Sequence, residues 1–119
     1  IDGDGAMLMH MGAMALIGTE KPRNFVHVII NNGAHETVGG MPTVASGLDI
    51  GMIARGCGYP RTLCVEREDE LDAALAEARQ SGDLILLEVR CALGARADLG
   101  RPTTTARENK QAFMRGLQR

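Results

Sequence analysis

Apolar residues recur along the chain in short segments that are separated by turns rich in glycine, proline and asparagine. Over residues 6–17, Met7, Met11 and Met14 recur at the spacing of one helix face, so a helix is predicted there. Residues 25–30 form a short run of branched apolar residues between two asparagines. Such a run predicts a buried strand.

The same alternation continues in the second half of the chain. Apolar residues at helical spacing predict helices over residues 46–55 and 68–80, and nearly continuous apolar runs predict strands over 62–65 and 83–89. Apolar strands separated by amphipathic helices are typical of a parallel sheet with helices on both faces. We therefore expect an α/β fold in which a parallel sheet is flanked by helices.

Both ends of the chain carry further signals. Thr105 and Glu108 have the spacing of a capping box, and a short helix with its apolar side at residues 113–117 is predicted to follow. Residues 31–43 are predicted to form a long loop. A strand is expected before Gly3, because a glycine-rich turn of this kind usually follows the end of one. The chain thus opens at its own binding loop, and we expect it to be truncated at the N-terminus.

The composition limits the kinds of protein that this chain can be. The 119 residues suffice for one small domain, and 45% hydrophobic with 24% charged residues describe a globular chain. A formal net charge of -2 and an aromatic content of 3% argue against a nucleic-acid-binding surface. No apolar run reaches the roughly 20 residues that span a bilayer. The three cysteines lack metal-ligand spacing and are expected to be reduced core thiols of a cytoplasmic protein.

Candidate chemistry begins at Gly3-Asp4-Gly5-Ala6, where the first helix is expected to start. Small residues let a ligand approach the backbone, and the free N–H groups of a helix N-terminus suit a diphosphate. The carboxylate of Asp4 alone would repel that diphosphate. A divalent cation is therefore expected between them, with Asp4 as a hard oxygen ligand.

A second polar pair, Asn31-Asn32, follows the strand predicted over residues 25–30. The carboxyl ends of neighbouring parallel strands lie side by side, and ligands bind there. Asp4 and Asn32 are therefore expected in one crevice. The Asn32 amide oxygen and a backbone carbonyl of the following loop can add two oxygens to a Mg²⁺ site. Each motif alone is weak, and their combination is what predicts the site.

The combination of residues 3–5 with Asn31-Asn32 resembles the cofactor motif of thiamine-diphosphate enzymes, among them 2-oxo-acid decarboxylases, acetolactate synthases and transketolases. The resemblance implies thiamine diphosphate and Mg²⁺ as cofactors. It assigns three metal ligands, namely Asp4, the Asn32 side chain and the main-chain carbonyl of Ala34. The implied cofactor-binding residues are Gly3, Asp4, Gly5, Ala6, Asn32 and Ala34.

Further segments are similar to the phosphonopyruvate decarboxylase group within the 2-oxo-acid decarboxylase family. These segments are residues 9–12, 21–24, 33–35, 38–40, 101–104 and 108–110. The resemblance implies decarboxylation of 3-phosphonopyruvate to phosphonoacetaldehyde and CO₂, a step of phosphonate metabolism. Sulfopyruvate decarboxylase and an acetolactate-synthase-like enzyme stay open as alternatives. So does a non-catalytic truncated module that acts only in assembly.

His35 and Glu36 directly follow the metal loop. By resemblance they are the candidate catalytic residues, with Glu36 assisting protonation or steering the substrate and His35 donating to the phosphonate. The alternatives are a solvated loop carboxylate and a histidine that only hydrogen-bonds the loop. Arg101 and Lys110 are open to binding a phosphonate or to being solvated surface.

The resemblance also implies what the chain lacks. Enzymes of this family use one module for the diphosphate and metal, and a second that contacts the aminopyrimidine and supplies an activating glutamate. Residues 1–119 correspond to the C-terminal part of the first module and contain no candidate for that glutamate. We expect a pyrimidine-binding module on a missing segment or another subunit, a homo-oligomeric assembly, and little activity from this chain alone.

Overall fold

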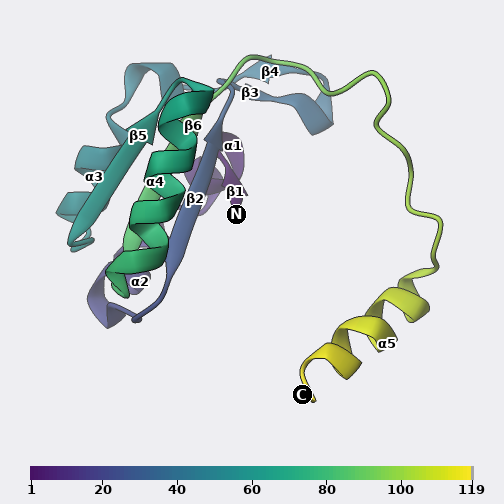
Figure 1. The fold of residues 1–119 in the computed structure, drawn as a ribbon. Helices are drawn as coiled ribbons and strands as arrows, with labels where there is room; N and C mark the ends of the chain where they lie inside the picture. The colour runs from purple at the N-terminus through teal and green to yellow at the C-terminus, as the bar shows by residue number, and fades with distance from the viewer. Residues whose placement is uncertain (119) are drawn as a thin grey trace.

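The protein folds around a parallel sheet, and the computed structural model describes residues 1–118. The sheet has four strands in the order β1-β2-β6-β5, with every neighbouring pair parallel (Figure 1). The strands are β1 (Asp2–Gly3), β2 (Val26–Asn31), β5 (Arg61–Val65) and β6 (Ile85–Arg90). The predicted α/β fold with a parallel sheet is confirmed, and so is a strand that leads into Asp4.

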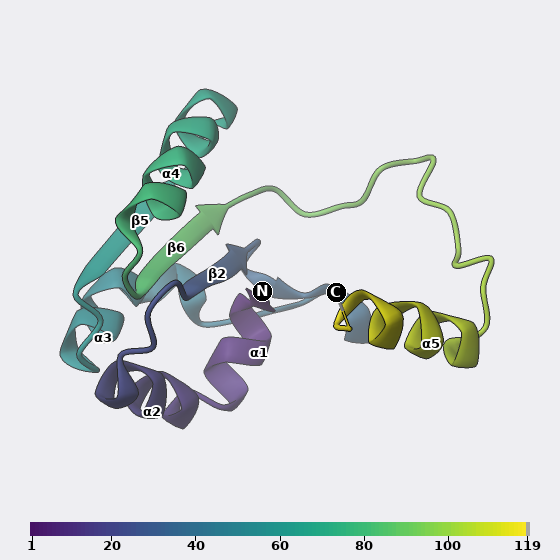
Figure 2. The same cartoon turned by 60° about the horizontal axis from the view of Figure 1, so that its bottom comes forward.

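Helices cover the two faces of the sheet unequally (Figure 2). The helices are α1 (Asp4–Met9), α2 (Gly12–Glu20), α3 (Ile50–Gly56) and α4 (Glu68–Ser81). The first three lie on one face, and α4 lies on the other. Leu86 of β6 belongs to the core on the first face, and Leu87 belongs to the core under α4. Each is fully buried, and such burial stabilises the fold by about 1.5–3 kcal/mol per side chain. Because the two side chains belong to different cores, β6 joins both layers.

The helix predicted over residues 6–17 is two helices in the structure. The first ends at Met9, because the φ of -135° at His10 is not helical, and α2 begins at Gly12. Glycine is a poor helix former, so a continuous helix through Gly12 would gain little. Met7 and Met14 both belong to the same core cluster despite the break. The spacing of apolar residues therefore predicted correctly that these methionines are buried, but the prediction of one continuous helix was wrong.

The loop predicted over residues 31–43 contains a small hairpin. Strand β3 (Ala34–His35) pairs antiparallel with β4 (Met41–Pro42), and a 3₁₀ turn, Glu36–Val38, joins them. Strands of two residues are too short to produce a sequence pattern. The hairpin matters because it fixes Ala34 and His35 against the carboxyl end of the sheet.

The third helix starts later than predicted. The Asp49 carboxylate accepts a hydrogen bond of 2.7 Å from the Met52 N–H, and this cap sets the first residue of α3 at Ile50. The preceding residues Ala45–Gly47 form a 3₁₀ turn instead of a helix. The bounds of α4, β5 and β6 lie within two residues of those predicted.

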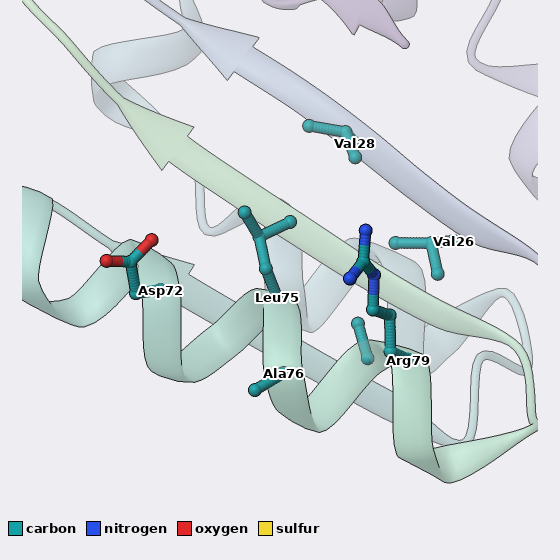
Figure 3. A pocket seen from close by; sticks show the side chains of 7 residues that line it. Val26, Val28, Asp72, Leu75, Ala76 and Arg79 are labelled. Atoms are coloured by element: carbon teal, nitrogen blue, oxygen red, sulfur yellow. The ribbon is translucent and has the colours of Figure 1, made fainter.

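One half of the sheet stays open on the α4 side. A groove of about 560 Å³ runs between α4 and β2. Figure 3 shows Leu75 and Arg79 of α4 on one wall, and Val26 and Val28 of β2 on the other. Helix α4 packs over β5 and β6, so the valines of β2 are only half-buried.

The C-terminal helix α5 (Ala106–Gly116) stands apart from the sheet at the end of an extended segment (Figure 1). Its capping box between Thr105 and Glu108 is present as predicted. Its apolar side is exposed rather than packed, with Phe113 67% exposed.

The cysteines are free thiols, but two of them, Cys64 and Cys91, lie at the surface. The expectation that all three are core residues is therefore wrong. Cys64 belongs to β5, an edge strand that is paired on one side, and Cys91 directly follows the last residue of β6. Among the helices of residues 1–118, none combines the length and the apolar character that crossing a membrane requires.

Candidate functional site

The carboxyl ends of β1 and β2 form one edge of the sheet, where the candidate site residues meet. Gly3 pairs with Ile30 across these strands, so Asp4 and Asn31 leave the sheet at neighbouring positions. A cavity of about 280 Å³ opens at this edge. Its lining comprises Gly3, Asp4, Gly5, Ala6, Ile30, Asn32, Ala34, His35, Glu36 and Thr37. Every residue that the sequence predicted for the site is in this lining, whereas Arg101 and Lys110 are exposed on the tail.

Asp4 is a buried carboxylate at the first position of α1, with 1% of its surface exposed. Its Oδ2 accepts a hydrogen bond of 2.5 Å from the Thr43 hydroxyl. The Thr43 backbone N–H donates in turn to the Gly33 carbonyl oxygen at 2.8 Å. An ionised carboxylate is costly to bury without a charged partner, and one hydroxyl is a weak substitute. The surroundings of Asp4 therefore suit a cation.

Asn32 is held at both ends of its side-chain amide. Its Oδ1 accepts a hydrogen bond of 3.1 Å from the Ala34 N–H, and its Nδ2 donates to Glu36 Oε2 at 2.7 Å. An asparagine that hydrogen-bonds the backbone two residues on forms an Asx turn, which gives this loop a defined shape. An amide oxygen has two lone pairs, so Oδ1 keeps one for a cation.

Glu36 links residues 32–34 to the C-terminal tail. Besides the bond from Asn32 to its Oε2, its Oε1 accepts a hydrogen bond of 2.7 Å from the Gly94 N–H. The carboxylate is exposed on one side and lines the cavity on the other. Glu36 is therefore an oriented hydrogen-bond acceptor at the mouth of the cavity.

His35 lies on β3 with its ring over the beginning of α1. A Cβ added to Gly5 would stand 2.3 Å from the His35 Nδ1, a distance that no real contact allows. The missing side chain at Gly5 thus makes room for the imidazole. His35 is half-buried in the cavity lining, where its ring can donate a hydrogen bond to an anionic ligand.

A buried network supports the strand that carries the GDG turn. The His27 Nε2 lies 2.8 Å from Asp2 Oδ2, and its Nδ1 lies 2.9 Å from the Tyr59 hydroxyl. Burial is the main cause that raises the pKa of Tyr59 to about 12, with the charges of Cys57 and Asp2 adding to it. The network ties β1 to β2 and to the segment that follows α3.

Sequence reasoning did not find Thr43 or the partners of Asn31. A lone threonine in a glycine-rich loop carries no pattern that points to a carboxylate 39 positions away. Within residues 1–118, no three His, Cys, Asp or Glu side chains gather into a group that could hold a metal. A cation here would therefore depend on amide and carbonyl oxygens beside Asp4.

The comparisons with known families identify one match. Residues 1–89 match the model for "Thiamine pyrophosphate enzyme, C-terminal TPP binding domain". A solved structure described as a putative thiamin diphosphate-dependent enzyme from Mycobacterium smegmatis aligns with a TM-score of 0.64 at 34% identity, over 77% of this chain and 17% of that one.

Two groups of curated proteins are similar to the chain. Phosphonopyruvate decarboxylase from Streptomyces viridochromogenes is 35% identical over 113 residues, which are 95% of this chain and 28% of that protein. Sulfopyruvate decarboxylase subunit beta from Methanocaldococcus jannaschii is 35% identical over 79 residues, which are 66% of this chain and 42% of that subunit. The chain thus spans between a quarter and a half of the length of these relatives.

Proposed function

This chain belongs to the thiamine pyrophosphate enzymes with a C-terminal TPP binding domain, and on that premise we propose that it supplies the diphosphate- and magnesium-binding half of a decarboxylase site. Residues 1–119 are then the C-terminal part of that binding domain. The observation that carries the proposal is a buried Asp4 carboxylate, paired with one hydroxyl and facing a cavity that Asn32 and Ala34 also line.

The donor set fits the proposed metal. A carboxylate, an amide oxygen and a backbone carbonyl are hard ligands of the kind that Mg²⁺ prefers, and Mg²⁺ completes its octahedron with phosphate oxygens and water. Asp4, Asn32 and Ala34 would hold it. The backbones of Gly3, Gly5 and Ala6 line the same cavity and would bind the diphosphate.

The cofactor, when bound, supplies an electron sink for the loss of CO₂ from a 2-oxo acid. The chain contributes groups at the mouth of the cavity. His35 would donate a hydrogen bond to the anionic group of the substrate. Glu36, held by Asn32 and Gly94, would deliver a proton to the carbon that loses CO₂ or orient the substrate.

We assign 3-phosphonopyruvate as the substrate, with phosphonoacetaldehyde and CO₂ as products. The support is the match over 95% of this chain to phosphonopyruvate decarboxylases. Sulfopyruvate is the second candidate, because sulfopyruvate decarboxylase beta subunits match at similar identity over a shorter part of the chain. Both substrates carry a second anionic group beside the 2-oxo acid, so the half-site described above serves either.

The proposed site needs a second module. Among residues 1–118, Glu36 is the one glutamate in the lining of the cavity, and we assign it to the substrate rather than to the aminopyrimidine. We assign the activation of the aminopyrimidine to a pyrimidine-binding module on another segment or subunit, within a homo-oligomer. A relative that is a separate beta subunit supports placing this module on another subunit.

Cofactor titration of the full-length protein tests the proposal. Thiamine diphosphate is titrated by calorimetry with and without Mg²⁺, for the wild type and for Asp4→Ala. Binding that requires Mg²⁺ and is abolished by Asp4→Ala is expected, with Asp49→Ala, at the cap of α3, as a control that leaves binding intact. Unchanged binding in Asp4→Ala would remove the metal assignment, and no binding to the wild type would favour a non-catalytic module. Product analysis with phosphonopyruvate, sulfopyruvate and pyruvate then separates the substrates.

A further inference from the structure

Glu88 is a buried carboxylate on β6, outside the lining of the candidate cavity. Only 2% of its surface is exposed, and the strand residues 85–87 before it are fully buried apolar side chains. A buried ionised carboxylate is costly unless close partners compensate for the water it loses. Its partners therefore show what this charge holds in place.

Two donors bind the same oxygen of Glu88. Its Oε1 accepts hydrogen bonds from Asn31 Nδ2 at 2.8 Å and from Arg90 Nε at 3.0 Å. The Nη1 of Arg90 donates in turn to Glu66 Oε1 at 2.9 Å. The bond to Glu88, followed by that to Glu66, raises the pKa of Arg90 above its usual range, so the guanidinium stays charged beside Glu88.

Asn31 transmits this anchoring to the loop. Its Oδ1 accepts a hydrogen bond of 3.2 Å from the Gly33 backbone N–H while its Nδ2 is bound to Glu88. A flipped amide would place an oxygen against Glu88 Oε1 and an N–H group against the Gly33 N–H. Glu88 therefore determines which end of the Asn31 amide faces the loop.

Gly33 stands between the two loop residues that would hold the metal, Asn32 and Ala34. Its φ of +70° is a left-handed conformation that favours glycine, so the loop turns sharply at this point. Its carbonyl oxygen accepts a hydrogen bond from Thr43, whose hydroxyl donates to Asp4. The bonds that fix Gly33 thus bear on the position of all three proposed metal ligands.

We propose that Glu88 is a positioning residue for the metal half-site, acting through the Asn31 amide on residues 32–34. The proposal rests on the proposed function, because that function places the metal at this loop. Residues that orient metal ligands typically change metal affinity by about 10- to 100-fold when they are replaced. Glu88 acts through one further side chain, so an effect of about tenfold is expected.

A donor–acceptor exchange in the full-length protein tests the proposal. Glu88→Gln keeps the size, and its amide oxygen can still accept from Asn31 and Arg90 in the place of Oε1. It removes the charge that strengthens both bonds, so the Kd for Mg²⁺ at saturating thiamine diphosphate should rise, by up to about tenfold. Asn31→Asp should weaken Mg²⁺ similarly, because two carboxylates then face each other. The double variant reverses the bond, since the new amide at position 88 donates to the new carboxylate at position 31, and it should restore most of the affinity.

The readouts separate a positioning role from a merely structural one. Loss of thermal stability with an unchanged Kd for Mg²⁺ in Glu88→Gln, or no rescue in the double variant, overturns the proposal. Glu66→Gln is the control and should leave the Kd unchanged, because Glu66 is exposed and contacts Glu88 only through Arg90. If Glu88→Gln does not fold, Arg90→Gln removes the neighbouring donor and must raise the Kd for the proposal to stand. Asp4→Ala without effect would refute the proposed function itself, whereas an effect in Asp4→Ala alone would refute only the role of Glu88.

Discussion

The imidazole of His35 lies so close to Gly5 that a Cβ on Gly5 would stand 2.3 Å from Nδ1 and 2.5 Å from Cε1. Gly5 belongs to α1 and His35 to β3, so this contact joins the GDG turn to the hairpin of β3 and β4. The second glycine of the motif therefore has a role inside the protein as well as toward a ligand. It lets the hairpin close over the start of α1.

Gly5→Ala is expected to lower the free energy of unfolding by about 1–3 kcal/mol, because the His35 ring must leave its place. Denaturant unfolding measures the change. Gly12→Ala is the matched control, since a Cβ there meets nothing within 4 Å and alanine favours the helix. Adding His35→Ala to Gly5→Ala should recover part of the loss. No recovery would show that the contact with His35 is not the cause.

Thr43→Val tests the hydroxyl that donates to Asp4. The exchange keeps the shape and removes the donor to Asp4 Oδ2, so the Mg²⁺-free protein should lose about 1–3 kcal/mol of stability. Saturating Mg²⁺ with thiamine diphosphate should return much of that loss, because a cation then compensates the carboxylate. Thermal unfolding with and without the ligands measures both values. Thr37→Val, an exposed threonine of the same cavity, should show neither effect.

The sequence predicts best where one face of an element meets a continuous core. Residues 84–87 are all apolar because β6 is buried on both faces. Along residues 68–80, apolar residues recur at helical spacing between charged ones, because one face of α4 is buried. The motif residues could be predicted for the same reason. Strand pairing between Gly3 and Ile30 places Asp4 and Asn32 at one edge of the sheet, as parallel topology requires.

The remaining features depend on contacts between distant residues. The break at His10 and the hairpin of β3 and β4 are shaped by what they pack against, and neither leaves a periodic pattern. Glu88 could have been singled out as the one charge within the apolar part of its strand. Its partner Asn31 is 57 positions away, however, and only the pairing of β2 with β6 brings the two together.

Tyr59 predicts a loss of stability at alkaline pH. Burial raises its pKa to about 12, whereas the unfolded chain releases the same proton near the ordinary value of 10.0. This contribution is complete below pH 10 and is lost as the pH rises toward 12. The stability of the wild type, measured by thermal unfolding, should therefore fall more steeply across this window than that of Tyr59→Phe. Equal slopes for the two proteins would contradict the shift, and because the chain holds one tyrosine, the comparison isolates it.

Glu36→Gln separates proton transfer from loop support at the mouth of the cavity. The carboxylate accepts hydrogen bonds from Asn32 and from the Gly94 N–H, and a glutamine can keep one of these but cannot transfer a proton. If Glu36 transfers a proton during turnover, kcat should fall by about 10²-fold or more, and one limb of the pH profile of kcat should disappear. The measurement is steady-state turnover of phosphonopyruvate by the full-length protein across pH, at saturating cofactor.

The matched control for Glu36→Gln is Gly94→Ala. The φ of +115° at Gly94 strains any residue with a Cβ, so alanine should displace the N–H donor from Oε1 and leave the carboxylate in place. If Glu36 only ties the tail to the loop, both variants should lower kcat alike and keep the pH profile of the wild type. If Glu36 handles a proton, Gly94→Ala should retain most of kcat and both limbs, since the Asn32 amide still orients the carboxylate.

We expect the outcome in which Glu36 handles a proton, because of the groups that line the cavity. Within that lining, Glu36 and His35 are the titratable side chains left for the substrate, since Asp4 is assigned to the proposed metal. His35 is assigned to the anionic group of the substrate, which leaves Glu36 for the proton. Parallel losses of kcat in Glu36→Gln and Gly94→Ala would instead assign Glu36 to the support of the loop.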